Sequence, residues 1–188
     1  MVQSRLSAAQ SVLLVVDVQD KLLKAIPTAP ELVKNAGFLL DVAALLGVPV
    51  LATEQYPKGL GPTTADIARR LRANVPAKTA FSCCGSDDFV GELAKLDRRS
   101  IVVVGMEAHV CVLQTALDLL EAGFAVHLPV DGVASRFAID RDTALRRLER
   151  AGAVPTTVET VAFEWRGDAA HPSFKAVSKL ILERSAFI

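Results

Sequence analysis

Short apolar runs alternate with longer segments of helical periodicity along most of the chain. Runs rich in β-branched residues predict strands over residues 11–16, 48–53, 77–81, 101–104, 124–128 and 154–158. Apolar residues at helical spacing predict helices over residues 31–46, 63–72, 87–95, 111–121, 141–151 and 174–182. Between them, E-Q-Y-P-K-G-L-G-P at residues 54–62 is rich in turn formers and is expected to lack regular structure. Strands alternating with helices predict an α/β protein, a three-layer αβα sandwich around a parallel sheet.

Composition limits the function classes. The 188 residues are expected to form a single domain, 1–188, and the 21 basic and 21 acidic residues balance, which argues against a nucleic-acid partner. No apolar run approaches the roughly 20 residues that span a bilayer, so no membrane partner is expected. Residues 1–10 lack the apolar core of a signal peptide. Three cysteines, with Cys83 adjacent to Cys84, do not make a disulfide framework. A cytoplasmic protein is predicted, with an organelle such as the mitochondrion left open.

Three polar residues are expected at the carboxyl edge of this sheet, where ligands bind in open α/β folds. Asp17 follows the first strand directly, Lys78 lies in the apolar segment V-P-A-K-T-A-F, and Cys111 lies between a buried strand and a helix. Unpaired N–H groups at the start of that helix are expected to favour thiolate at Cys111, which indicates a nucleophile.

Each of these residues also has a structural interpretation. Cys111 is a small side chain of a type that is often simply buried. Asp17 is able to cap the following helix, and Lys78 is able to extend its stem over Phe81 at the surface. The residues taken singly leave these alternatives open.

Taken together, the motifs resemble the isochorismatase-like (cysteine hydrolase) superfamily. The resemblance is carried by L-L-V-V-D-V-Q at 13–19, K-T-A-F-S at 78–82, G-M-E-A-H-V-C-V-L-Q-T-A at 105–116 and D-G-V-A-S-R at 131–136. It spans nearly the whole chain. It implies a Rossmann-type, six-stranded parallel sheet and a homo-oligomer, for which the apolar content and the tail residues Phe187 and Ile188 also argue.

The resemblance implies a catalytic triad of Asp17, Lys78 and Cys111. Cys111 would attack an amide-like carbonyl to give a thioester, with Asp17 as general base and then acid, and Lys78 holding Asp17. The backbone N–H groups of Glu107 and Cys111 would form the oxyanion hole, and a cis peptide is expected at Met106–Glu107.

One departure from the family concerns the metal. Nicotinamidase-type relatives bind a metal through an Asp-x-His motif, but Gln55 and Tyr56 stand at that place here and are poor zinc ligands. A lone Glu54 does not make a site. We therefore expect no metal and no cofactor, and a substrate pocket lined by Gln55, Tyr56 and Met106.

The resulting hypothesis is a metal-independent cysteine hydrolase that cleaves a small amide or related C–N bond of a small-molecule substrate. The alternatives are an isochorismatase-type vinyl-ether hydrolase and a non-catalytic interaction module, while a nuclease lacks a basic stripe or metal cluster. His109, two residues before Cys111, is expected to be a structural turn residue rather than the base. Arg136 and Asp140 are expected to make capping or salt-bridge contacts.

Overall fold

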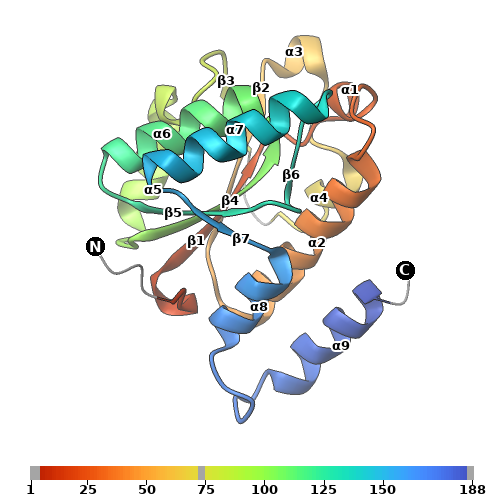
Figure 1. Cartoon of the computed structure of the whole chain (residues 1–188), viewed down its shortest axis with the longest axis vertical. Coiled ribbons are helices and arrows are strands. Elements are labelled where there is room, and N and C mark those ends of the chain that lie inside the picture. Colours follow the sequence, from red (N-terminus) through yellow and green to blue (C-terminus); the bar gives the residue numbers. More distant parts are fainter. Residues whose placement is uncertain (1–4, 72–74, 186–188) are drawn as a thin grey trace.

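The sheet lies between two layers of helices in the computed structural model, which describes residues 5–71 and 75–185 (Figure 1). Residues 1–4, the end of the predicted helix 63–72 at Arg72, and the tail residues Phe187 and Ile188 lie outside the described residues.

The sheet runs in the order β3-β2-β1-β4-β5-β7, and the short strand β6 pairs with β4. All pairings between named strands are parallel. The predicted α/β fold with a parallel sheet is confirmed, with β6 added to the expected six strands. The strand bounds are β1 Ser11–Val16, β2 Val50–Gln55, β3 Ala77–Lys78, β4 Ser100–Met106, β5 Ala125–Pro129, β6 Val133–Ala134 and β7 Val154–Thr156.

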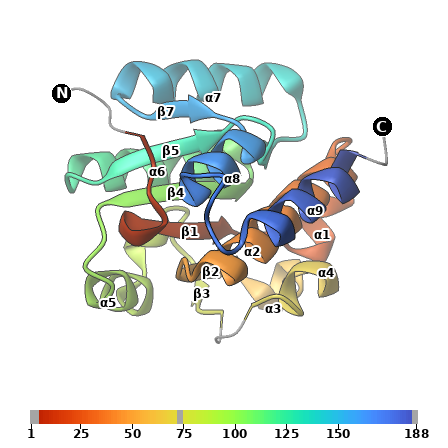
Figure 2. The same cartoon turned by 90° about the horizontal axis from the view of Figure 1, so that it is seen from below.

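The helices divide between the two faces of the sheet. The α-helices are α1 Asp20–Leu23, α2 Ala29–Leu46, α3 Pro57–Leu60, α4 Ala65–Ala68, α5 Asp87–Lys95, α6 Leu113–Glu121, α7 Ala138–Ala151, α8 Val158–Arg166 and α9 Phe174–Ser185. Two 3-10 turns, η1 Ala8–Gln10 and η2 Cys83–Gly85, and a π-helical turn, η3 Ala108–Val112, complete the elements described here. Figure 2 shows α2, α8 and α9 in front of the sheet. Within residues 5–71 and 75–185, none of these helices combines the length and apolar character needed to cross a bilayer.

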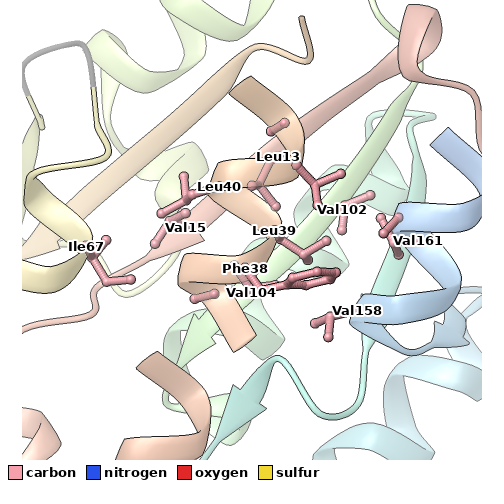
Figure 3. Packing of buried hydrophobic residues seen from close by; sticks show 14 of the residues in the cluster. Leu13, Val15, Phe38, Leu39, Leu40, Ile67, Val102, Val104, Val158 and Val161 are labelled. Atoms are coloured by element: carbon pink, nitrogen blue, oxygen red, sulfur yellow. The ribbon is translucent and has the colours of Figure 1, made fainter. Parts of the chain in front are cut away.

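Alternate residues of the central strands β1 and β4 belong to two hydrophobic cores, one on each face of the sheet. Leu13 and Val15 of β1 and Val102 of β4 face α2 and α8, where they meet Leu39 and Val161 (Figure 3). The intervening residues of the same strands pack on the opposite side against α5, α6 and α7. Both faces of β1 and β4 are therefore buried, which is why their sequences are continuous apolar runs.

Four expectations about local structure are wrong. The strand predicted at 77–81 is a strand only over Ala77–Lys78. In the segment 54–62, Glu54 and Gln55 extend β2, because β3 pairs with them, and Pro57 then starts the single turn α3. The helix predicted at 63–72 is ordered as an α-helix only over Ala65–Ala68. The strand predicted at 154–158 ends early, because Thr157 caps α8 by accepting a hydrogen bond from the Thr160 N–H.

A glycine allows the two central strands to end side by side. Gly105 has φ +129°, and a Cβ atom there would lie 2.1 Å from the Val16 carbonyl oxygen. Only glycine accommodates both the torsion and the contact. This close approach brings the residue after β1, Asp17, next to the chain that leaves β4.

Candidate active site

The predicted triad residues meet at the carboxyl edge of the sheet. Asp17 follows β1 in a left-handed conformation with φ +52°, which aspartate tolerates better than most residues, and it is fully buried. Lys78 is the last residue of β3, and Cys111 lies in the π-helical turn η3 that follows β4. Lys78 and Cys111 are also buried, at 4% and 5% exposure.

Asp17 and Lys78 form a buried ion pair. Lys78 Nζ donates to Asp17 Oδ2 at 2.7 Å, and both side chains are essentially inaccessible to solvent. The second carboxylate oxygen, Asp17 Oδ1, accepts a hydrogen bond from Thr53 Oγ1 at 2.8 Å. Asp17 therefore does not serve as a helix cap through its side chain, and Lys78 is not a surface residue.

Further oxygen atoms surround the Lys78 ammonium. It contacts Gln55 Oε1 at 2.8 Å, the Phe81 carbonyl at 2.9 Å and the Ala80 carbonyl at 3.3 Å. The nitrogen of the same Gln55 amide, Nε2, donates a hydrogen bond to the Thr79 carbonyl at 2.9 Å. Gln55 thus holds Lys78 instead of presenting a free amide to a pocket.

The electrostatics of Cys111 differ from the expectation of a stabilised thiolate. Burial raises the pKa of the Cys111 thiol to about 12, the negative charge of Asp17 adds to the rise, and Lys78 opposes it. A hydrogen bond with Asp17 further favours the protonated thiol. Desolvation and the neighbouring carboxylate both favour the protonated form, so Cys111 is a neutral thiol beside a carboxylate.

The turn before Cys111 carries the cis peptide that the family resemblance implies, between Met106 and Glu107. Glu107 caps η3, and its carbonyl accepts from the N–H groups of Val110 and Val112. Its carboxylate oxygen Oε2 accepts from the backbone N–H of Arg136 at 3.1 Å and from Arg136 Nε at 3.0 Å. The expected salt bridge of Arg136 is confirmed, and it ties the Glu107 turn to the chain after β6.

The other two residues predicted to line the pocket, Tyr56 and Met106, have very different surroundings. Tyr56 is 53% exposed, and its N–H donates to the Lys78 carbonyl, so its backbone lies beside Lys78 while its side chain reaches the surface. Its ring lies against Gly59, where any Cβ atom would approach to 2.5 Å. Met106 is completely buried in the core that faces α2, so its side chain is not on a pocket wall in this structure.

His109 contacts residues other than Cys111. Its Nδ1 lies 3.0 Å from Ser135 Oγ, and its Nε2 lies 3.8 Å from Asp140 Oδ2. These contacts fit the expected role of a turn residue, and Asp17 is the carboxylate beside Cys111.

Sequence reasoning missed Thr53, which is buried within β2 and donates to Asp17. The rule that directed attention to Asp17 also applies to Thr53, the last residue of the strand predicted at 48–53, and would have found it, although β2 itself continues to Gln55. Cys83, to which the sequence analysis assigned no role in the site, has its sulfur 3.3 Å from Thr53 Oγ1.

A metal site does not form around Glu54. Its Oε1 accepts from the N–H and the hydroxyl of Thr63, at 2.6 and 2.7 Å. In the part of the chain that the structure describes, no group of three or more His, Cys, Asp or Glu side chains is placed to hold a metal ion.

Known proteins share this architecture. The isochorismatase domain family matches residues 11–160. Isochorismatase domain-containing protein 2 from Xenopus laevis is 43% identical over 181 residues, covering 95% of this chain and 87% of the relative. The solved structure of MAR1 ribonuclease from Caenorhabditis elegans is 42% identical, with a TM-score of 0.90 and coverage of 95% of this chain and 93% of that one. The YcaC gene product of Escherichia coli, described as an octameric hydrolase of unknown specificity, shares the fold at 23% identity, with a TM-score of 0.84 and coverage of 99% and 98%. The chain therefore belongs to the isochorismatase family.

Proposed function

We propose that this protein is a metal-independent cysteine hydrolase that cleaves a small amide or related C–N bond. The observation that carries the proposal is the buried Asp17 carboxylate, which contacts the Lys78 ammonium on one side and the Cys111 thiol on the other. A thiol with a raised pKa is not nucleophilic at rest, so it needs a base in contact with it. Asp17 is that base.

In the first step, Asp17 takes the Cys111 proton as Sγ attacks the substrate carbonyl. A C–S bond forms, and the carbonyl oxygen becomes an oxyanion that accepts hydrogen bonds from the backbone N–H groups of Glu107 and Cys111. Lys78 balances the charge of Asp17 before the transfer and remains anchored by its other oxygen contacts while the proton moves.

In the second step, the oxyanion collapses and the C–N bond breaks. The leaving nitrogen takes the proton from Asp17, leaving a thioester on Cys111. Water then attacks the thioester with Asp17 again as base. The C–S bond breaks, the carboxylic acid leaves, and Asp17 returns the proton to Cys111 Sγ, which restores the thiol.

The charges around the site favour an uncharged substrate. Lys78 is paired with Asp17, and Arg136 is paired with Glu107. A dianion such as isochorismate would have to displace one of these carboxylates from its cation, at a desolvation cost that an amide avoids. For this reason we place vinyl-ether hydrolysis second to amide hydrolysis.

RNA cleavage is a further candidate because the Caenorhabditis elegans structure, 42% identical to this chain, bears the name ribonuclease. The balanced charge of this chain argues against it, since a polyanion is usually held by a basic surface.

The test is turnover of a panel of small neutral amides, with isochorismate and single-stranded RNA as further substrates. Purified wild-type protein is compared with Cys111→Ala, and the acyl intermediate is trapped by acid quenching and mass spectrometry. We expect release of amine from at least one amide, an acyl group on the Cys111 peptide, and loss of both in Cys111→Ala.

Cys84→Ala is the matched control, because Cys84 is a half-buried thiol in the neighbouring turn η2, where its N–H donates to Ser82 Oγ. It should retain turnover. Isochorismate hydrolysis that survives Cys111→Ala would favour the vinyl-ether function, and RNA cleavage lost in Asp17→Asn would favour the nuclease. Binding without turnover of any substrate would favour an interaction module.

A homo-oligomer and a cytoplasmic location complete the proposal. The Escherichia coli relative is described as an octamer, and free Cys83, Cys84 and Cys111 thiols suit a reducing compartment. Sedimentation of the purified protein tests the first, and fractionation of the source cells tests the second.

A further inference from the structure

Asp17 is held by a chain of side chains that extends beyond the triad. The members of this Thr53–Cys83 chain are Thr53 on β2, Cys83 in η2 and Thr115 on α6. Thr53, Cys83 and Thr115 are at most 1% exposed, so water does not compete for their hydrogen bonds.

The direction of each hydrogen bond follows from the donors available. An ionised carboxylate only accepts, so Thr53 uses its single hydroxyl proton in the 2.8 Å contact with Asp17 Oδ1. The Thr53 oxygen is then left as an acceptor toward Cys83 Sγ, 3.3 Å away. The Cys83 thiol must therefore be the donor.

The far end of the chain is fixed as well. The Cys83 N–H donates to Thr115 Oγ1 at 2.9 Å. Thr115 lies one helical turn beyond Cys111, on the helix that continues from η3. The base on β1 and the helix that carries the nucleophile are thus joined through buried hydrogen bonds.

We propose that Thr53, backed by the Cys83 thiol, is a positioning residue that orients the Asp17 carboxylate toward Cys111. Lys78 binds one carboxylate oxygen and Thr53 the other, so the two donors together fix the rotation of the carboxylate group. A carboxylate held by Lys78 alone would rotate about that contact and lose its alignment with the thiol. Burial also raises the pKa of the Cys83 thiol, which keeps its proton available for Thr53. This inference rests on the proposed function, because it assigns Thr53 its role through Asp17.

The test measures the rate at which Cys111 is acylated by p-nitrophenyl acetate, followed by release of p-nitrophenolate and by mass spectrometry of the Cys111 peptide. Thr53→Val keeps the side-chain volume and removes the hydroxyl, and Thr53→Ser keeps the hydroxyl. We expect the maximal acylation rate to fall about tenfold to a hundredfold in Thr53→Val, the usual effect of losing one hydrogen bond to a charged group. Thr53→Ser should restore most of the rate, and the half-saturating probe concentration should change little.

A second pair of variants, at Cys83, tests the positioning role without any change at Thr53. Cys83→Ala deletes the donor behind Thr53 and should slow acylation about twofold to tenfold, whereas Cys83→Ser keeps a donor and should stay near wild type. If Thr53→Val does not fold, this pair decides the question.

Equal acylation rates in wild type, Thr53→Val and Cys83→Ala would overturn the positioning role while leaving the proposed function intact. Equal slowing by Thr53→Ser and Thr53→Val would also overturn it, since a lost hydroxyl would not then be the cause. Failure of wild-type Cys111 to acylate at all would instead refute the proposed function, and this inference with it.

Discussion

The contacts of Cys111 make an unusual prediction about its reactivity with iodoacetamide. Asp17 raises the pKa of Cys111 and Lys78 lowers it, so substitutions that both abolish catalysis should move alkylation in opposite directions. Asp17→Asn should accelerate alkylation of Cys111, and Lys78→Met should slow it. A merely damaged site would not show opposite signs.

The magnitude follows from the charge and the distance. Unit charges about 4 Å apart interact by about 4 kcal/mol at an effective dielectric constant of about 20, and measured effects of one neighbouring charge on a pKa are about one to three units. With the Cys111 pKa at about 12, about one molecule in 10⁴ carries the thiolate at pH 8. Asp17→Asn should raise that fraction by about tenfold to a thousandfold. A less basic thiolate is also less nucleophilic, with a Brønsted coefficient of about 0.5, so the alkylation rate should rise about threefold to thirtyfold.

The assay is the second-order rate of iodoacetamide addition at pH 8, measured peptide by peptide by mass spectrometry. Cys84 is the internal control, because burial and Asp118 raise its pKa to about 11 and neither Asp17 nor Lys78 contributes. Its rate should be unchanged in both variants. Thermal melting monitors folding, since breaking the buried ion pair leaves one uncompensated charge. Slower alkylation in Asp17→Asn, or a wild-type Cys111 midpoint below pH 9, would refute the reasoning.

Three further predictions test other parts of the structure. Gly105→Ala should destabilise the fold by about 3 kcal/mol or more, seen in urea unfolding, because the new Cβ would meet the Val16 carbonyl at a positive φ. Gln55→Leu removes an oxygen from Lys78 and should reduce kcat about tenfold with little change in KM, whereas loss of a pocket residue would chiefly alter KM. Burial lowers the pKa of His127 in the folded protein below its unfolded value of 6.5. The contribution of neutral His127 to stability is therefore complete above pH 6.5 and is lost as the pH falls from there through the folded-state pKa. His127→Gln should flatten the stability profile in that window; an unchanged profile would exclude His127 as its source.

Strand and helix positions were largely predictable because both faces of β1 and β4 are buried. Such strands leave continuous apolar runs in the sequence, and the glycines that follow α2 and α7 mark helix ends. The wrong predictions fall where tertiary contacts decide local structure. Gln55 is in a strand only because β3 lies beside it, and the helix α8 begins where Thr157 caps it.

The same division holds for the candidate site. The sequence alone determined the family, the parallel fold and the three side chains at or just beyond the carboxyl ends of their strands, because motif identity and the alternation of strands with helices are local properties of the chain. Only the tertiary structure decided how these side chains act on one another. Desolvation and the Asp17 charge keep Cys111 protonated, contrary to the expected thiolate. The Gln55 amide oxygen accepts a hydrogen bond from Lys78, and Thr53 donates one to Asp17. Ionisation and hydrogen bonding depend on burial and on neighbours distant in sequence, which no local pattern records.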